Sequence, residues 1–301
     1  MASIQAGGAT RYTQPLHNAK GGAMTLPRSR YLSVMGREFH LTEWGDDAAP
    51  ALIMWHGLAR TGRDFDTLAA HFSDRYRVIC PDTLGRGLSG WSRAPRRDYT
   101  LDTYMRHAVA LLEALGIERL DWIGTSMGGA LGMLLAAGPL KGRMTRLVMN
   151  DIGPALNPVA VERIRAYLAQ HPSFRTMTEF EAFVRQVYKP YGFQTDAEWR
   201  RMTETSARRR GDGRITPHYD PAVMRVFAET AGDYEVWAEY DKVECPTLVL
   251  RGVDSDLLLP EVADEMTRRG PRARLVTVPG CGHAPALNVP EQIAVLEEFL
   301  D

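Results

Sequence analysis

The residues best suited to chemistry in this chain lie in a short segment flanked by glycines, Gly124-Thr125-Ser126-Met127-Gly128. The segment matches the pattern G-x-S-x-G, follows an apolar stretch typical of a strand, and opens a stretch typical of a helix at Met127. In so tight a turn, side chains two residues before and two residues after the serine would collide, which explains both glycines. We therefore predict that the Ser126 hydroxyl is a nucleophile held above the end of a strand.

A serine hydroxyl attacks efficiently only when a nearby base takes its proton. Of the eight histidines, His283 lies in the loop 279–284, between the last predicted strand and the last predicted helix. This loop follows the carboxyl end of a strand, where open α/β sheets place their sites, so His283 is the predicted general base. The sequence contains no H-E-x-x-H motif or other metal-ligand spacing, and we expect neither a metal nor a cofactor.

The imidazole of such a base needs a carboxylate that fixes its tautomer and stabilises its charge. Asp256 is the preferred candidate because it lies four residues before Pro260, where the next helix is predicted to begin. Asp254 lies in the same loop and also fits a turn or capping role. Asp151, at the end of the preceding predicted strand, is the third candidate. The sequence leaves these three carboxylates open, with Asp256 first.

The tetrahedral intermediate of acyl transfer carries an oxyanion, which must be met by preorganised N–H groups. The backbone N–H of Met127, the residue after the serine, is one expected donor. The second donor is expected from the turn after the predicted strand 51–55, and we assign it to the N–H of Leu58. In the same turn, His56 is expected to brace the loop rather than act as a second base.

Two hydrophobic patterns alternate along most of the chain and would position these residues. Short apolar or alternating runs predict strands, and longer runs with helical periodicity predict helices. Strands that alternate with helices imply an α/β fold, with a mostly parallel sheet and helices on both faces. The predicted strands are 38–44, 51–55, 76–80, 119–123, 145–149, 247–251 and 273–277, and the predicted helices between and after them are 64–72, 101–115, 127–137, 260–268 and 290–300.

The alternation is interrupted at residues 155–240, where the periodicity is helical and no strand is evident. Helices are predicted there at 159–168, 179–187, 196–207 and 221–230. We therefore expect a flexible leader at 1–28, an α/β core formed by 29–154 and 241–301, and a helical cap at 155–240. The cap is expected to roof the pocket and to select the substrate by apolar fit.

The composition of the chain indicates which binding partners and which cellular compartment to expect. Charged residues make up 24% of the chain and the formal net charge is −1, so no strong field would attract nucleic acid. No apolar run of about 18 residues predicts a membrane span, and the N-terminal residues lack the pattern of a secretory signal. The three cysteines, none in a C-x-x-C motif, suit free thiols in a reducing cytoplasm. A small-molecule ester is the expected partner, and formation of a homodimer is left open.

Five motifs follow one another along the chain: His56-Gly57, the loop Asp82-x-x-Gly85-x-Gly87-x-Ser89, the turn around Ser126, the acid loop at Asp256, and Gly282-His283. In this order they resemble the motifs of the α/β-hydrolase superfamily, over about residues 31–301. The resemblance implies an eight-stranded, mostly parallel sheet, a helical cap after the sixth strand and no cofactor. The segment 150–154 also resembles the start of the cap in a bacterial group of these hydrolases. Members similar to haloalkane dehalogenases or epoxide hydrolases carry an aspartate where this chain has Ser126.

A fold alone does not assign a function, so the site must decide among the activities of the superfamily. The leading hypothesis is a carboxylesterase-like serine hydrolase that cleaves a small to medium, partly apolar ester through an acyl-enzyme. The alternative within the same fold is a hydrolase of carbon–carbon bonds, thioesters or lactones. A hypothesis of a different class is a ligand receptor that hydrolyses weakly or not at all. Turnover of a simple p-nitrophenyl ester would separate the enzyme from the receptor.

Overall fold

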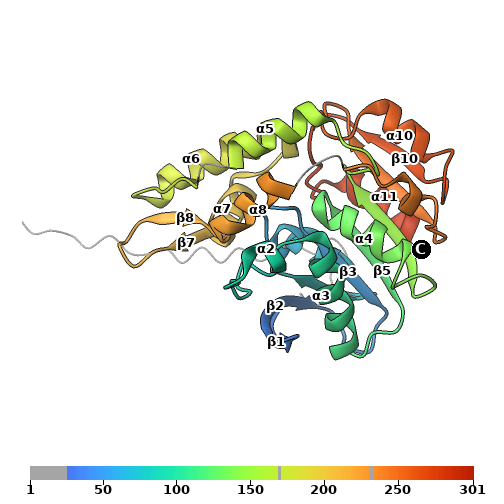
Figure 1. Cartoon of the computed structure of the whole chain (residues 1–301), viewed down its shortest axis with the longest axis horizontal. Coiled ribbons are helices and arrows are strands. Elements are labelled where there is room, and N and C mark those ends of the chain that lie inside the picture. The colour runs from blue at the N-terminus through green and yellow to red at the C-terminus, as the bar shows by residue number, and fades with distance from the viewer. Residues whose placement is uncertain (1–25, 169–170, 231–233) are drawn as a thin grey trace, which may run out of the picture.

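The computed structural model describes residues 26–168, 171–230 and 234–301. Its central strands are β1 (Arg28–Val34), β2 (Arg37–Trp44), β3 (Ala51–Trp55), β4 (Arg77–Pro81), β5 (Leu120–Thr125), β6 (Met144–Asn150), β9 (Thr247–Gly252) and β10 (Arg274–Val278). They form one eight-stranded sheet in the order β1-β2-β4-β3-β5-β6-β9-β10 (Figure 1). β1 and β4 are antiparallel to β2, and the other neighbouring strands are parallel. The predicted fold class, with its mostly parallel sheet of eight strands, is therefore confirmed.

Helices cover both faces of this sheet because its strands are apolar on both faces. In β3, the buried side chains of Leu52 and Met54 pack in one cluster with α1 (Asp66–Phe72) and α11 (Pro290–Leu300). Ile53 and Trp55 pack in the other cluster with α3 (Leu101–Ala114) and α4 (Met127–Ala137). Successive side chains of a strand point to opposite faces, so one short apolar run serves two cores. The other helical elements of the core are η1 (Gly62–Phe65), α2 (Pro95–Asp98) and α10 (Pro260–Met266).

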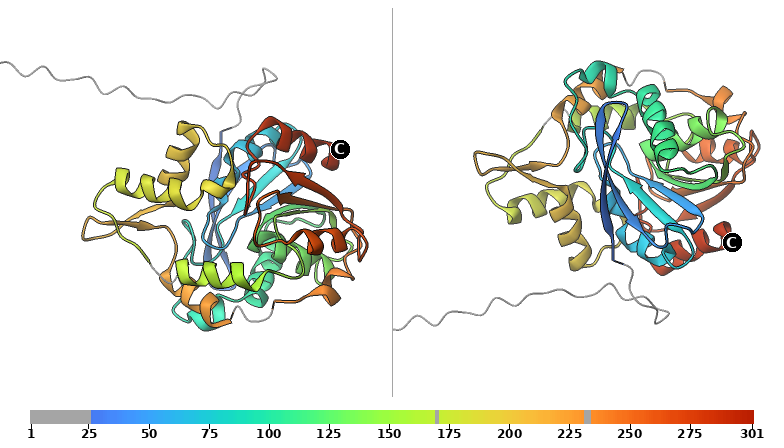
Figure 2. Two further views of the ribbon diagram at one scale, coloured as in Figure 1. Left: turned by 90° about the horizontal axis from the view of Figure 1, so that it is seen from above. Right: turned by 90° about the horizontal axis from the view of Figure 1, so that it is seen from below.

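Between β6 and β9 the chain forms a group of elements that lies to one side of the sheet (Figures 1 and 2). We call residues 155–240 the cap segment. Its own small core is formed by Phe180, Val184, Trp199 and Ile215. Its elements are α5 (Pro158–Leu168), α6 (Met177–Val187), η2 (Lys189–Tyr191), α7 (Asp196–Ser206), β7 (Ala207–Arg209), β8 (Ile215–Pro217), α8 (Pro221–Thr230) and α9 (Trp237–Tyr240).

Two parts of this architecture differ from the sequence prediction. The cap segment contains the antiparallel pair β7 and β8, although no strand is evident there from the pattern. Each of these strands has only three residues, and two of those in β7 are exposed arginines, so no alternation can be detected. The structure also has a strand, β1, at Arg28–Val34, where the sequence pattern predicts none.

Residues 1–25 of the predicted leader lie outside the described residues. Within the described ranges, no helix is long and apolar enough to cross a membrane.

Candidate active site

Ser126 lies at a sharp turn, where it is the single residue between the end of β5 and the start of α4. Its backbone has φ 53° and ψ −118°, a conformation that a non-glycine residue adopts only at a cost. A Cβ atom on Gly124 would lie 2.2 Å from the Gly128 backbone, and one on Gly128 would lie 2.0 Å from the Trp55 carbonyl oxygen. The motif therefore forms the strained turn that it predicts, and its two glycines allow the strand and the helix to meet.

His283, in the loop between β10 and α11, reaches this turn. Its Nε2 lies 2.9 Å from the Ser126 Oγ, and its Nδ1 lies 2.7 Å from Oδ2 of Asp151. An ionised carboxylate can only accept hydrogen bonds, so Nδ1 carries the proton and Nε2 offers its lone pair to the Ser126 hydroxyl. The three side chains form one hydrogen-bonded chain suited to removing the proton from Ser126.

The Asp151 carboxylate is fully buried at the carboxyl end of β6 and is held from three directions. Its Oδ1 accepts from the Gly252 N–H at 2.9 Å, and its Oδ2 accepts from the Ser255 hydroxyl at 2.6 Å as well as from His283. Its backbone N–H donates to the Leu250 carbonyl at 2.7 Å. Apart from His283, these partners belong to β9 and the loop that follows it, so the neighbouring strand fixes the carboxylate that contacts His283.

The prediction that Asp256 orients His283 is wrong. The Asp256 side chain is 48% exposed and pairs with Arg163 of α5, at 2.8 Å between Nη2 and Oδ2. Asp254 is exposed as well, and its backbone N–H donates to the Cys281 carbonyl. The buried Arg251 guanidinium donates to the carbonyls of Leu258 and Ser255 and so shapes this loop. In that shape, Ser255 rather than either aspartate faces the site.

The two residues predicted to supply oxyanion N–H groups lie beside Ser126. Met127 is the first residue of α4, where a helix leaves its N–H groups without partners in the helix. The turn after β3 passes close by, since a Cβ atom on Gly57 would lie 3.6 Å from the Ser126 Cβ. Leu58 follows directly in that turn. The geometry is compatible with the predicted oxyanion hole, and its role stays a prediction.

His56 occupies this turn as a neutral brace. Complete burial lowers the pKa of His56 to about 4. Its Nδ1 donates to the Gly57 carbonyl at 2.7 Å, and its Nε2 accepts from the Thr83 N–H at 2.9 Å. The Gly57 carbonyl and the Leu58 N–H belong to the same peptide group, so the imidazole fixes the orientation of the expected oxyanion donor.

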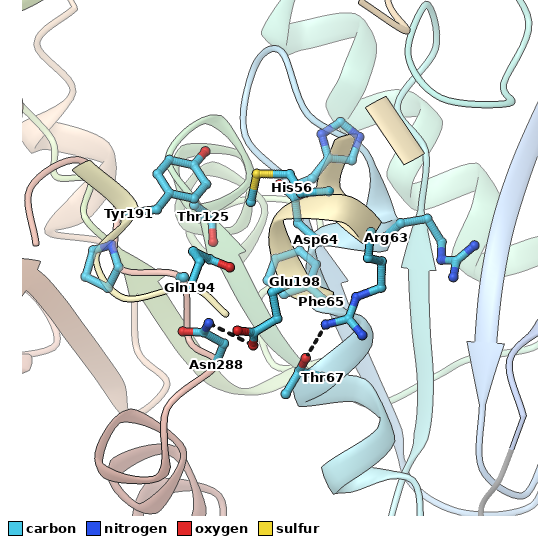
Figure 3. Close-up of a pocket in the computed structure, with 14 residues that line it drawn as sticks. His56, Arg63, Asp64, Phe65, Thr67, Thr125, Tyr191, Gln194, Glu198 and Asn288 are labelled. Carbon is cyan, nitrogen blue, oxygen red and sulfur yellow. Dashed lines mark hydrogen bonds between the residues drawn. The ribbon is translucent and has the colours of Figure 1, made fainter. Parts of the chain in front are cut away.

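A cavity of about 40 Å³, lined by both polar and apolar side chains, lies between the cap segment and the core, beside Thr125, the residue before Ser126 (Figure 3). Two side-chain pairs join the cap segment to the core around it. Asn288 donates to Glu198 Oε1 at 3.0 Å, and Arg201 donates to Thr67 Oγ1 at 2.9 Å. The remaining lining residues are His56, Arg63, Asp64, Phe65, Tyr191, Gln194, Met202, Pro285 and Ala286.

A second serine–histidine–aspartate arrangement lies elsewhere in the core and was not predicted. His40 Nε2 is 2.7 Å from Ser29 Oγ, and His40 Nδ1 is 2.8 Å from Asp82 Oδ2. Ser29 lies within β1, in regular antiparallel pairing with Thr42, and not on a strand-to-helix turn. The arrangement therefore connects the edge strand β1 to the loop after β4. Ser29 can serve as a control serine when the reactivity of Ser126 is measured.

Among the described residues, no group of three or more histidine, cysteine, aspartate or glutamate side chains is placed to hold a metal ion.

The sequence matches the model of a known protein family. Residues 52–296 match the family described as "Alpha/beta hydrolase family". The chain is 42% identical over 267 residues to the 3-hydroxybutyrate-oligomer hydrolase of Cupriavidus necator. The match covers 85% of this chain and 90% of that protein. It is 27% identical over 281 residues to the 2-hydroxymuconate semialdehyde hydrolase of Pseudomonas putida. That match covers 90% of this chain and 93% of that protein.

Solved structures share the same architecture. An alpha/beta hydrolase from Novosphingobium aromaticivorans superposes with a TM-score of 0.82 at 34% identity, and the match covers 92% of this chain and 99% of that one. With its eight-stranded sheet, its strained serine turn and a family model that spans most of its length, this chain belongs to the alpha/beta hydrolase family and is a hydrolase.

Proposed function

We propose that the protein is a serine esterase that cleaves short oligoesters of 3-hydroxy acids. The observation that carries this proposal is the hydrogen-bonded chain from Asp151 through His283 to Ser126 at a strained turn. The identity of 42% to a 3-hydroxybutyrate-oligomer hydrolase supports the choice of substrate. In such an oligomer, each bond between units is a carboxylic ester, which is the bond that this arrangement of side chains is suited to attack.

The reaction begins with attack of the Ser126 Oγ on the ester carbonyl carbon while His283 Nε2 takes the hydroxyl proton. Asp151 stabilises the imidazolium that forms, and the N–H groups of Leu58 and Met127 stabilise the oxyanion. Collapse of the tetrahedral intermediate breaks the ester C–O bond, and His283 gives its proton to the departing alkoxide. The products of this half are an acyl group on Ser126 and a shortened alcohol.

The second half regenerates the enzyme. A water molecule attacks the acyl-enzyme carbonyl as His283 Nε2 takes one of its protons. The second tetrahedral intermediate then releases the carboxylic acid, and the proton returns from His283 to the Ser126 Oγ. No cofactor is needed for either half, because all proton transfers pass through His283.

The substrate class can be tested with a defined trimer of 3-hydroxybutyrate. The purified protein should release monomer and dimer, measured by chromatography, and Ser126→Ala should lose nearly all of this activity. The wild-type protein should also hydrolyse p-nitrophenyl butyrate. Hydrolysis of the nitrophenyl ester without hydrolysis of the trimer would refute the oligoester substrate class but not the esterase activity. Preferential cleavage of a 2-hydroxymuconate semialdehyde, a carbon–carbon bond substrate, would refute both.

The partners and the compartment are part of the proposal. A small-molecule ester is the proposed partner, without nucleic acid. The free thiols of Cys80, Cys245 and Cys281 suit the cytoplasm. A homodimer would appear as a mass of twice 33.6 kDa in light scattering of the purified protein.

A further inference from the structure

Arg86 is a fully buried arginine in the loop after β4, close to the predicted oxyanion residues. Its Nε donates to the Leu58 carbonyl at 2.9 Å, and its Nη1 donates to the Leu84 carbonyl at 2.8 Å and to the Tyr104 hydroxyl at 2.5 Å. Its guanidinium lies 4.9 Å from the centre of the Tyr104 ring. No carboxylate of the described residues lies within 4.0 Å of this guanidinium.

A buried guanidinium that is neutralised by no adjacent carboxylate is costly to keep, so its partners indicate what it is kept for. Two of them are the residues that carry the expected oxyanion N–H groups. Nε holds the Leu58 carbonyl, and Nη2 lies 3.7 Å from the Met127 Sδ. Arg86 is therefore in contact with both sides of the expected oxyanion hole, whereas its own side chain does not occupy the hole.

The loop that carries Arg86 is also joined to the cap segment through its backbone. The Gly87 N–H donates to the His218 carbonyl at 2.9 Å, and the Asp220 N–H donates to the Gly85 carbonyl at 2.8 Å. Arg86 itself forms an isolated antiparallel bridge with Tyr219. The main chain around Arg86 thus bonds to the cap segment, while its side chain contacts the turn after β3 that contains Leu58, which we call the oxyanion turn.

We propose that Arg86 is a positioning residue that locks the oxyanion turn in its active orientation and connects it to the cap segment. The inference rests on the proposed esterase function. Leu58 lies between two peptide groups, and each is held by a different side chain. His56 holds the Gly57 carbonyl, and Arg86 holds the Leu58 carbonyl. With both carbonyls fixed, the Leu58 N–H keeps one direction before the substrate arrives, as oxyanion stabilisation requires.

A residue that orients the oxyanion turn affects the transition state more than the bound ester. Arg86→Met keeps the length and apolar stem of the side chain and removes its donors and its charge. For p-nitrophenyl butyrate, kcat should fall by about 10- to 100-fold, somewhat less than the loss of an oxyanion donor itself, and KM should change by less than about threefold. Arg86→Lys keeps the charge but cannot hold Leu58 and contact Met127 at once, so its kcat should fall at least about fivefold.

Arg77→Met is the matched control, because it removes another buried arginine at the opposite, amino-terminal end of β4, where Arg77 pairs with Glu43. This variant should lose stability but keep kcat. If Arg86→Met does not fold, which circular dichroism would show, Arg86→Lys decides the question by the same kinetic criterion. A folded Arg86 variant with kcat within threefold of wild type, or with a rise in KM alone, would overturn the proposal.

The rate of phosphonylation of Ser126 by a fluorophosphonate gives a second readout that needs no ester substrate. The adduct places an oxygen where the oxyanion would lie, so the rate constant should fall in the Arg86 variants in parallel with kcat. A wild-type protein that neither hydrolyses esters nor reacts with the probe would refute the proposed function. A reactive wild type with unchanged Arg86 variants would refute only the role of Arg86.

Discussion

At the residue scale, the acid of the site shows how closely two carboxylates can compete. Asp151 and Asp256 both follow strands whose carboxyl ends meet at one edge of the sheet. The difference between them is burial and partners, because Asp151 is fully buried against His283 whereas Asp256 faces solvent and pairs with Arg163. These partners depend on how the loop after β9 folds, which no spacing in the sequence specifies.

The assignment of the acid predicts unequal effects of two conservative substitutions. Asp151→Asn keeps the shape but permits the wrong imidazole tautomer, so kcat for p-nitrophenyl butyrate should fall by about 10³- to 10⁴-fold. Asp256→Asn, the control, removes only an exposed ion pair, which is worth about 0–1 kcal/mol, and should leave kcat within about twofold. A greater loss at position 256 than at position 151 would show that the loop after β9 folds differently in solution.

The neutral brace His56 makes stability depend on pH. The pKa of His56 is about 4 in the folded protein, below its value of about 6.5 in the unfolded chain. Between these two pH values the unfolded chain takes up a proton that the folded protein does not, so the free energy of unfolding falls as the pH is lowered from about 6.5 to about 4. The fall from this group should be on the order of 3 kcal/mol and should stop below pH 4.

Urea unfolding of the wild type and of His56→Asn at pH 7 and pH 4.5 measures this contribution. His107 is also buried, with its pKa lowered to about 4 by desolvation, and contributes to the same fall in both proteins. The variant should therefore be less stable at pH 7 but lose less stability on acidification. An equal loss in the two proteins would mean that His56 does not resist protonation in the fold.

At the scale of elements, the sequence predicts well what depends on local periodicity. The helix at 127–137, the strand at 51–55 and the last helix at 290–300 have the predicted bounds, because each has a continuous apolar pattern ended by glycine, proline or a polar residue. The strands β7 and β8 are too short for a pattern, and β1 was missed because most of its residues are exposed. Contacts between distant segments, such as Ser29 with His40 and Asp82, have no local signal at all.

The packing of β5 against α4 predicts that the glycines of the serine turn cannot be replaced. A Cβ atom at Gly124 would overlap the backbone of Gly128, where neither side can move without changing the angle between strand and helix. Gly124→Ala should therefore cost several kcal/mol of unfolding free energy, as overpacking and backbone strain do, and should abolish ester turnover. Gly211→Ala is the control, since nothing lies within 4 Å of its Cβ position and the residue is exposed.

Thermal unfolding and ester turnover of both variants provide the measurement. The Gly211 variant should match the wild type within about 0.5 kcal/mol. A Gly124→Ala protein with wild-type stability and turnover would mean that the turn relaxes more easily than its contacts indicate.

At the scale of the whole molecule, the residues proposed to break the bond lie on the sheet core, and the cap segment contributes to the walls of the cavity beside Thr125. Met202 of α7 lines that cavity, together with Tyr191 and Gln194 of the cap segment. The residues proposed to break the bond thus lie on other elements than the cap residues that we propose discriminate between substrates.

This separation predicts that trimming the cap segment alters selectivity more than chemistry. In Met202→Ala, kcat for p-nitrophenyl acetate should stay within about twofold. The ratio of kcat/KM between longer and shorter acyl esters should change by about 10-fold, since each methylene that loses an apolar contact such as that of Met202 is worth about 1–3 kcal/mol. Kinetics on a series from acetate to octanoate would measure this ratio. An unchanged chain-length profile would show that the substrate does not extend into this cavity.

Labelling of the whole chain with a fluorophosphonate tests most directly whether Ser126, activated by His283 and Asp151, is the nucleophile of an ester hydrolase. After digestion and mass spectrometry, we expect one adduct per chain, on the peptide that contains Ser126, and loss of p-nitrophenyl butyrate turnover in step with labelling. Ser126→Ala should carry no adduct and should lose nearly all turnover, because binding and the oxyanion hole alone give only about 10³- to 10⁴-fold over water, whereas Ser29→Ala should label and turn over like the wild type. An adduct at Ser29 or Cys281 that tracks the loss of activity, or full activity after complete labelling of Ser126, would contradict the assignment.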